Sequence, residues 1–119
     1  MRGNRDYALG RLKSGVLNRT EQAYSDHLET LRRAGSILWF EFEGVTFKIA
    51  EGCRYTPDFV VMNSACQIEC HEVKGFMRED SRVKIKTAAD KFHPFRFILV
   101  RVKPKRDGGG GWTYEVMGE

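Results

Sequence analysis

The chain has 119 residues, enough for one domain with its own hydrophobic core and too few for two. Its hydrophobic fraction of 41% is near that of ordinary globular proteins, and its longest apolar stretch, Phe97–Val100, is far shorter than the ~20 residues of a membrane-spanning helix. The net charge is only +4, the three cysteines cannot all pair, and no signal-peptide segment follows Met1, so we expect a cytoplasmic protein with no membrane partner.

The first predicted element is a helix. Residues 1–17 are basic and interrupted by glycines, and we expect them to form a flexible arm ahead of a single domain at residues 18–119. Asn18 is a favourable helix N-cap, and Glu21 completes a capping-box pattern three residues later. Apolar side chains then recur at helical spacing, and Gly35 is a typical C-terminal stop.

A run of strands is predicted next. Their expected ranges are Ile37–Phe42, Val45–Ile49, Arg54–Met62 and Gln67–Lys74. Glu43-Gly44 favours a tight hairpin between the first two strands, and Asn63-Ser64 favours another between the last two.

The second half of the chain predicts one more helix and two strands. The helix should begin at Asp80 or Ser81 and run to about Phe92, before Pro94. Its expected inner face is Val83, Thr87, Ala88 and Phe92. Phe95–Val102 is apolar on both faces, which indicates a central strand, and Trp112–Met117 should form a last strand after a glycine-rich loop. The order predicts an α/β fold with a mixed sheet flanked by helices.

Three side chains suited to phosphodiester chemistry fall near predicted strand ends. Asp58 lies in one strand, while Glu72 and Lys74 share a face at the end of the next, ~6.6 Å apart along the backbone. Carboxylates bind Mg²⁺, an ion that polarises a phosphoryl oxygen and acidifies a water. A lysine can orient that water and offset negative charge in the transition state. Counting outward from the Asn63-Ser64 turn puts Asp58 near Cys70, diagonal to Glu72.

Two alternative interpretations of these residues remain. Asp58 could be a polar residue at a strand end, with Glu72 and Lys74 forming a same-face ion pair of little energetic value. Cys53, Cys66, Cys70 and His71 could instead offer zinc ligands. If residues 66–74 form one strand, however, Cys66 and Cys70 lie ~13 Å apart, too far for one tetrahedral site.

The motifs Pro57-Asp58 and Glu72-Val73-Lys74 resemble those of the PD-(D/E)XK nuclease superfamily. The similarity is strongest to small phage-encoded endonucleases of the endonuclease I and junction-resolvase type. It implies a restriction-endonuclease-like α-β-β-β-α-β core and covers roughly residues 18–102. It also implies a DNA endonuclease that uses Mg²⁺, or Mn²⁺ as a substitute, and no small-molecule cofactor.

The resemblance implies a role for each matching residue. Asp58, Glu72 and the Val73 carbonyl would hold the metal, Lys74 would be the catalytic lysine, and Glu21 fits the place of a glutamate that the family often carries on its first helix. The capping box alone also explains Glu21.

A basic region accompanies the motif. Between Lys74 and Arg106, eleven Lys and Arg residues oppose three acidic residues, a local excess of +8. Such a patch attracts phosphate backbones, although a solvated surface gives the same composition. The residues that we expect to contact DNA are Arg78, Arg82, Lys84, Lys86, Lys91 and Arg101. His71 should face away from Glu72 and be structural.

Two other functions fit the same sequence. The chain could be a non-catalytic DNA-binding module with a coincidental site, or a subunit of a larger phage or transposon DNA-processing assembly. Paired cuts in both strands would require two copies of a chain with one site, so a homodimer is plausible.

Overall fold

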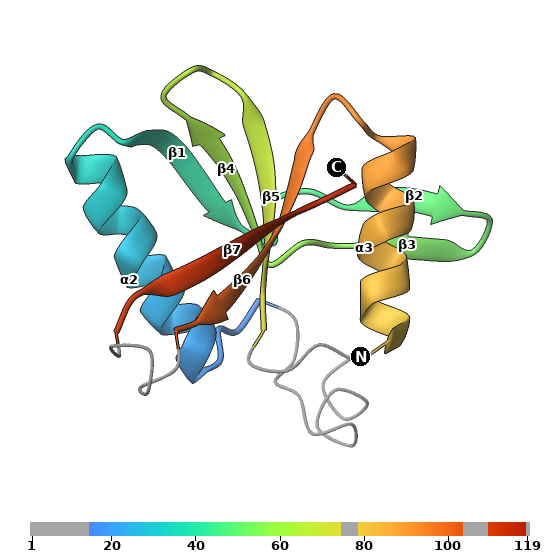
Figure 1. The fold of residues 1–119 in the computed structure, drawn as a ribbon, viewed down its shortest axis with the longest axis horizontal. Helices are drawn as coiled ribbons and strands as arrows, with labels where there is room; N and C mark the ends of the chain where they lie inside the picture. Colours follow the sequence, from blue (N-terminus) through green and yellow to red (C-terminus); the bar gives the residue numbers. More distant parts are fainter. Residues whose placement is uncertain (1–14, 75–78, 104–109, 119) are drawn as a thin grey trace.

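The structure is a computed structural model that describes residues 15–74, 79–103 and 110–118. A mixed five-stranded sheet lies between two helices (Figure 1). The strand order is β1 (Ile37–Phe42), β4 (Phe59–Asn63), β5 (Ile68–Val73), β6 (Arg96–Val102), β7 (Trp112–Met117). Helix α2 (Arg19–Arg33) covers one face. Helix α3 (Glu79–Lys91) covers the other, together with a two-stranded sheet of β2 (Phe47–Ala50) and β3 (Cys53–Tyr55).

This arrangement confirms the predicted α/β class. The expected order α-β-β-β-α-β is met by α2, β1, β4, β5, α3 and β6. Strands β5 and β6 run parallel, and the other neighbouring strands of the large sheet run antiparallel. Strand β6 is an interior strand with Phe97–Val100 buried, as its two apolar faces predicted. Among the described residues, no helix is long and apolar enough to cross a membrane.

The predicted start of helix α2 is confirmed. The Asn18 side chain accepts a hydrogen bond from the Glu21 N–H (2.8 Å), and the Glu21 carboxylate accepts one from the Asn18 N–H (3.0 Å). At the other end Gly35 has φ 82°, a left-handed conformation that favours glycine. Tyr24 and Leu28 form the buried stripe of the helix.

The predicted hairpin through Glu43-Gly44 is wrong. Strand β1 pairs with β4, and β2 pairs with β3 in the separate small sheet. A backbone hydrogen bond extends the pairing of β1 with β4 by one residue: the Glu43 N–H donates to the Asp58 carbonyl (2.8 Å).

The predicted single strand Arg54–Met62 is also wrong, because the chain divides into β3 and β4 around Pro57. Proline lacks the N–H that a central strand needs. Asp58 therefore lies immediately before β4 rather than within a strand. The hairpin between β4 and β5 is confirmed, but its loop is Ser64–Cys66, and Cys66 has φ 64°.

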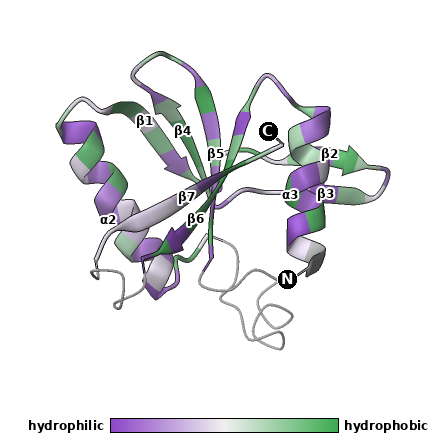
Figure 2. Ribbon diagram, in the orientation of Figure 1, coloured by the Kyte–Doolittle hydropathy of each residue, from purple (hydrophilic) through white to green (hydrophobic). Residues whose placement is uncertain are grey.

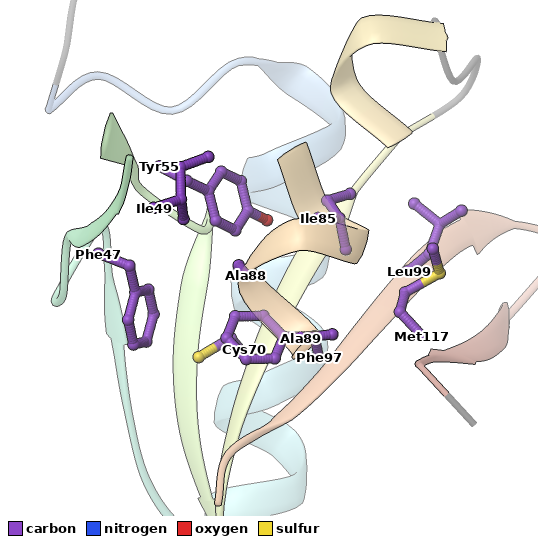
Figure 3. Packing of buried hydrophobic residues seen from close by; sticks show 10 residues of the cluster. All are labelled: Phe47, Ile49, Tyr55, Cys70, Ile85, Ala88, Ala89, Phe97, Leu99 and Met117. Atoms are coloured by element: carbon purple, nitrogen blue, oxygen red, sulfur yellow. The ribbon is translucent and has the colours of Figure 1, made fainter. Parts of the chain in front are cut away.

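The core on the α3 side is built differently from the expected one (Figure 3). Ile85, Ala88 and Ala89 of α3 are buried against β2, β3 and the large sheet, and Phe92 packs at the edge of this cluster. Val83 is 55% exposed and Thr87 is exposed, so half of the predicted inner face is wrong. Hydrophilic and hydrophobic residues alternate along both helices, whereas β4 and β6 are mainly hydrophobic (Figure 2).

Three sequence predictions concern residues outside those described. They are the main part of the flexible arm (residues 1–14), the DNA-contact role of Arg78, and most of the glycine-rich loop (residues 104–109).

Candidate active site

Asp58, Glu72 and Lys74 come together at the C-terminal end of β5. Phe59 pairs with His71 in the antiparallel register of β4 and β5, so the next position outward brings Asp58 opposite Glu72. The sequence count placed Asp58 near Cys70 and diagonal to Glu72, because it assumed a shorter turn. Directly opposed residues have Cβ atoms about 4.5–5.5 Å apart, closer than the diagonal neighbours that the sequence predicted.

Each carboxylate is held by groups from a neighbouring segment. The Val73 N–H donates to Asp58 Oδ2 (2.8 Å), which fixes Asp58 against the end of β5. The Tyr55 hydroxyl donates to Glu72 Oε1 (2.7 Å), and Lys74 Nζ lies 3.4 Å from Glu72 Oε2. The site thus joins three strands, β3, β4 and β5.

The two carboxyl groups lie in a poorly solvated place. Glu72 is only 7% exposed, and burial raises its pKa against the opposing effects of Lys74 and Tyr55. Burial also raises the pKa of Asp58, and the charges of Glu72 and Glu21 raise it further, although the Val73 N–H and Lys74 act in the opposite direction. A bound cation would relieve both the burial and the mutual repulsion.

The charge of Glu21, in the first turn of α2, raises the pKa of Asp58. Its carboxylate also completes the capping box with Asn18. The structure therefore supports the capping interpretation directly and leaves a metal role for Glu21 as a prediction.

The donor set fits a hard divalent cation. Mg²⁺ is commonly bound through one or two carboxylates, and waters and substrate phosphate complete its coordination. Asp58 and Glu72 supply two such carboxylates, and the Val73 peptide adjoins them. Within residues 15–74, 79–103 and 110–118, no cluster of three or more His, Cys, Asp or Glu side chains has metal-ligating geometry, so an all-protein cage is not what these residues form.

Sequence reasoning missed Tyr55 as part of the site. Tyr55 is 8% exposed, and burial together with the Glu72 charge raises the pKa of its hydroxyl, which therefore stays protonated and donates to Glu72. An aromatic residue in an apolar strand gave no signal of this role. Only the pairing of β2 with β3, which brings β3 over the end of β5, reveals it.

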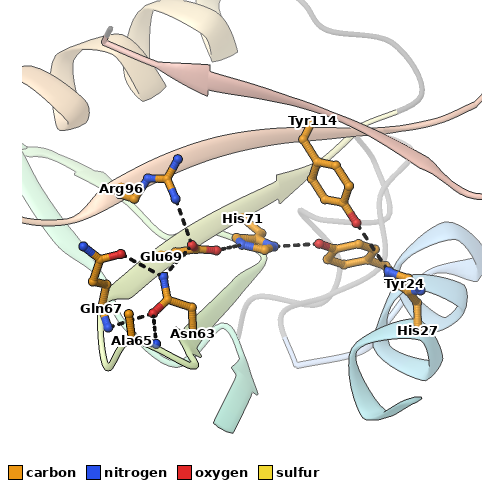
Figure 4. Close-up of polar contacts among 9 residues, drawn as sticks. All are labelled: Tyr24, His27, Asn63, Ala65, Gln67, Glu69, His71, Arg96 and Tyr114. Carbon is orange, nitrogen blue, oxygen red and sulfur yellow. Dashed lines mark hydrogen bonds and ion pairs between the residues drawn. The ribbon is translucent and has the colours of Figure 1, made fainter. Parts of the chain in front are cut away.

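On the opposite face of β5 lies a buried polar network (Figure 4). His71 contacts the Tyr24 hydroxyl through Nδ1 (2.6 Å) and Glu69 Oε1 through Nε2 (2.9 Å). Glu69 in turn accepts from Asn63 (2.9 Å) and Arg96 (3.2 Å). This confirms that His71 faces away from Glu72. The network fixes α2, with Glu21 at its start, to the strand that carries Glu72.

The described basic residues that were predicted to contact DNA lie on two elements, α3 and β6. Arg82 is ion-paired with Glu115 (3.3 Å), and Lys84 donates to the Arg54 carbonyl (3.5 Å). Lys86 is exposed on a different flank of α3. Lys91 is in the last turn, about 18 Å along the helix axis from its first residue at ~1.5 Å per residue. Arg101 lies on β6, at the end of the sheet where β5 carries Glu72 and Lys74.

The cysteines are dispersed. Cys70 is buried in the core on the α3 side, where burial raises the pKa of its thiol to about 12, Cys66 is exposed in the β4–β5 loop, and Cys53 is half-buried in β3.

Comparison of the chain with protein-family models, with curated proteins and with solved structures finds no match.

Proposed function

We propose that this protein is a metal-dependent DNA endonuclease of the PD-(D/E)XK type that acts on DNA in the cytoplasm of a phage-infected host cell. The observation that carries the proposal is the opposition of two carboxylates, the buried Glu72 and the half-buried Asp58, with Lys74 paired to Glu72 at the end of a strand. An ordinary ion pair with Lys74 would require only one of the two carboxylates. The second carboxylate, with its raised pKa, destabilises the empty site and favours binding of a cation.

Each residue has a distinct task in this proposal. Asp58 and Glu72 would hold Mg²⁺, or Mn²⁺ in its place, and the Val73 carbonyl would be a further ligand. When bound, the ion would polarise the scissile phosphate and promote ionisation of a water. Lys74, whose side chain is one-third exposed, reaches from Glu72 toward solvent and would orient the attacking water and offset the developing negative charge. Tyr55 keeps the Glu72 carboxylate in place.

The proposal predicts cleavage of plasmid, linear and four-way-junction DNA in Mg²⁺ or Mn²⁺ and none in EDTA. Asp58→Asn should abolish cleavage while DNA affinity stays equal or becomes tighter, because a neutral amide binds Mg²⁺ poorly and repels phosphate less. Asp90→Asn is the matched control, since Asp90 is exposed on α3, and it should cleave like the wild type. Cleavage by Asp58→Asn at the wild-type rate would refute the site.

The alternative functions give different results in the same assay. A non-catalytic binding module would shift DNA in a gel without cutting it in any metal. A subunit of a larger assembly would neither cut nor bind DNA at physiological salt. If the wild type cuts both strands at paired positions, sedimentation should show the homodimer that such symmetric cutting requires.

A further inference from the structure

Arg101 stands out among the cations of this protein. In the part of the chain that the structure describes, Arg101 Nε is the one buried side-chain nitrogen or oxygen without a hydrogen-bond partner. Two other arginines on the large sheet and α3 have carboxylate partners: Arg96 contacts Glu69 (3.2 Å) and Arg82 contacts Glu115 (3.3 Å). The buried donor of Arg101 has neither a carboxylate nor a carbonyl.

Such a group lowers the stability of the folded state. A guanidinium N–H that is withdrawn from water and not given an acceptor loses its hydration without compensation, and the loss is larger for a charged group than for a neutral one. Native structures leave few polar groups in this condition, and one that persists calls for an explanation such as an absent ligand. An anion is the ligand to which the unpartnered N–H of a half-buried guanidinium would donate.

The register places this donor beside the proposed active site. The Lys74 N–H donates to the Val100 carbonyl (2.9 Å), so Arg101 is the next residue on the strand adjacent to Lys74. Leu99, two residues earlier, pairs with Glu72 and belongs to the core on the α3 side. Because strand side chains alternate between faces, Arg101 points to that same side, in the row of Lys74 and about 4.8 Å away across the strands.

We propose that Arg101 binds the phosphate that is cleaved, and is therefore a catalytic residue rather than one of several general contacts to the DNA backbone. This inference rests on the proposed nuclease function, and it adds a phosphate-binding residue to the metal-binding residues of that site. Asp58 and Glu72 repel a phosphate, and Lys74 is engaged by Glu72. Arg101 is a cation on the same edge that no described acid neutralises. A guanidinium matches a phosphate through two parallel N–H···O bonds, a geometry that lysine cannot reproduce.

The test uses Arg101→Met, which keeps the length of the side chain and removes its charge and donors. Single-turnover cleavage at saturating DNA and Mg²⁺ should fall by about 10²–10³-fold, the usual loss for one positioned group that stabilises transition-state charge. The melting temperature should stay the same or rise by about 2–4 °C, because an unpaired buried donor has been removed. Arg101→Lys should recover little of the lost rate. Arg33→Met, on the exposed surface of α2, is the matched control and should change neither quantity.

A second readout does not depend on catalysis. Inorganic phosphate in EDTA should raise the melting temperature of the wild type and of Arg33→Met, but not of Arg101→Met. If the wild type cuts no DNA under any condition while phosphate stabilisation still requires Arg101, the nuclease proposal fails and the anion site stands. If Arg101→Met cleaves at the wild-type rate, or melts several degrees lower with its phosphate response intact, Arg101 is a structural residue and the inference is wrong.

Discussion

Replacing Tyr55 with phenylalanine should move the acidic limb of the pH–rate profile to higher pH. Tyr55 is buried, and its hydroxyl donates to Glu72 Oε1 at 2.7 Å. That hydrogen bond lowers the pKa of Glu72, opposing the dominant effect of burial, which raises it. Removing the bond therefore raises the pKa further. Because only the ionised carboxylate would hold a metal, activity should be lost at a higher pH in Tyr55→Phe than in the wild type.

The expected size of the shift follows from the two protonation states. A hydrogen bond to a charged group contributes about 1.5–3 kcal/mol, whereas one to a neutral group contributes about 0.5–1.5 kcal/mol. The difference, roughly 1–1.5 kcal/mol, corresponds to about one pKa unit. The acidic limb should therefore shift upward by about one pH unit at subsaturating Mg²⁺, where binding of the metal competes with binding of the proton.

The assay is plasmid nicking between pH 5 and 9 at a fixed, subsaturating Mg²⁺ concentration. Tyr114→Phe is the matched control, because Tyr114 is half-exposed on β7 and its hydroxyl contacts His27 (3.3 Å), not the carboxylates. Circular dichroism should show that both variants are folded. A folded Tyr55→Phe variant whose acidic limb coincides with that of the wild type would refute the claim that Tyr55 controls the ionisation of Glu72.

Four further predictions concern the site, the buried network and the substrate. Lys74→Ala should lower the single-turnover rate by about 10²–10³-fold with little change in Mg²⁺ dependence, measured by metal titration. Glu21→Gln keeps a side chain that can complete the capping box and removes its charge, so loss of metal-saturated activity in this variant would indicate a metal role. If Glu21→Ala lowers only the melting temperature, Glu21 acts in capping alone. The hydrogen bond from His71 is the main cause that lowers the pKa of Glu69 in the folded protein. The ionised Glu69 therefore stabilises the fold above its unfolded pKa, and this stabilisation is lost as the pH falls through the lower folded pKa. Melting curves at pH 3–7 should show a weaker acid dependence in Glu69→Gln. Cleavage of random-sequence DNA should show no sharp consensus at the cut sites, because the chain has few Asn and Gln residues for reading bases, and a strong consensus would contradict that expectation.

The sequence predicted best those features that depend on neighbouring residues. The capping box of Asn18 and Glu21 and the stop at Gly35 are local signals, and helix α2 begins and ends accordingly. Strands β1 and β7 match their predicted ranges because alternation or apolar density marks them within a few residues. The carboxylate motif was also recognisable, since Asp58 and Glu72 lie near strand ends.

Features that depend on distant pairing were not predictable in the same way. Nothing between Phe42 and Phe47 shows that β1 pairs with β4 instead of with its neighbour in sequence. The consequence for the site is large, because the displaced hairpin of β2 and β3 is what delivers Tyr55 to Glu72. The link between Tyr24 and His71 is likewise a contact across 47 residues that no spacing rule contains.

The length of the turn between β4 and β5 decides whether the two carboxylates share a face of the sheet. Asn63 accepts hydrogen bonds from the Ala65 and Gln67 N–H groups, and Cys66 takes a left-handed conformation, which closes a three-residue turn. The pairing sets Asp58 directly opposite Glu72, whereas the sequence count placed it near Cys70. Opposite residues of an antiparallel pair share a face of the sheet. With one residue fewer in the turn, Asp58 would be opposite His71 and would face away from Glu72. The turn at Asn63 thus determines how strongly Asp58 and Glu72 repel each other, and with that how much a bound cation stabilises the protein.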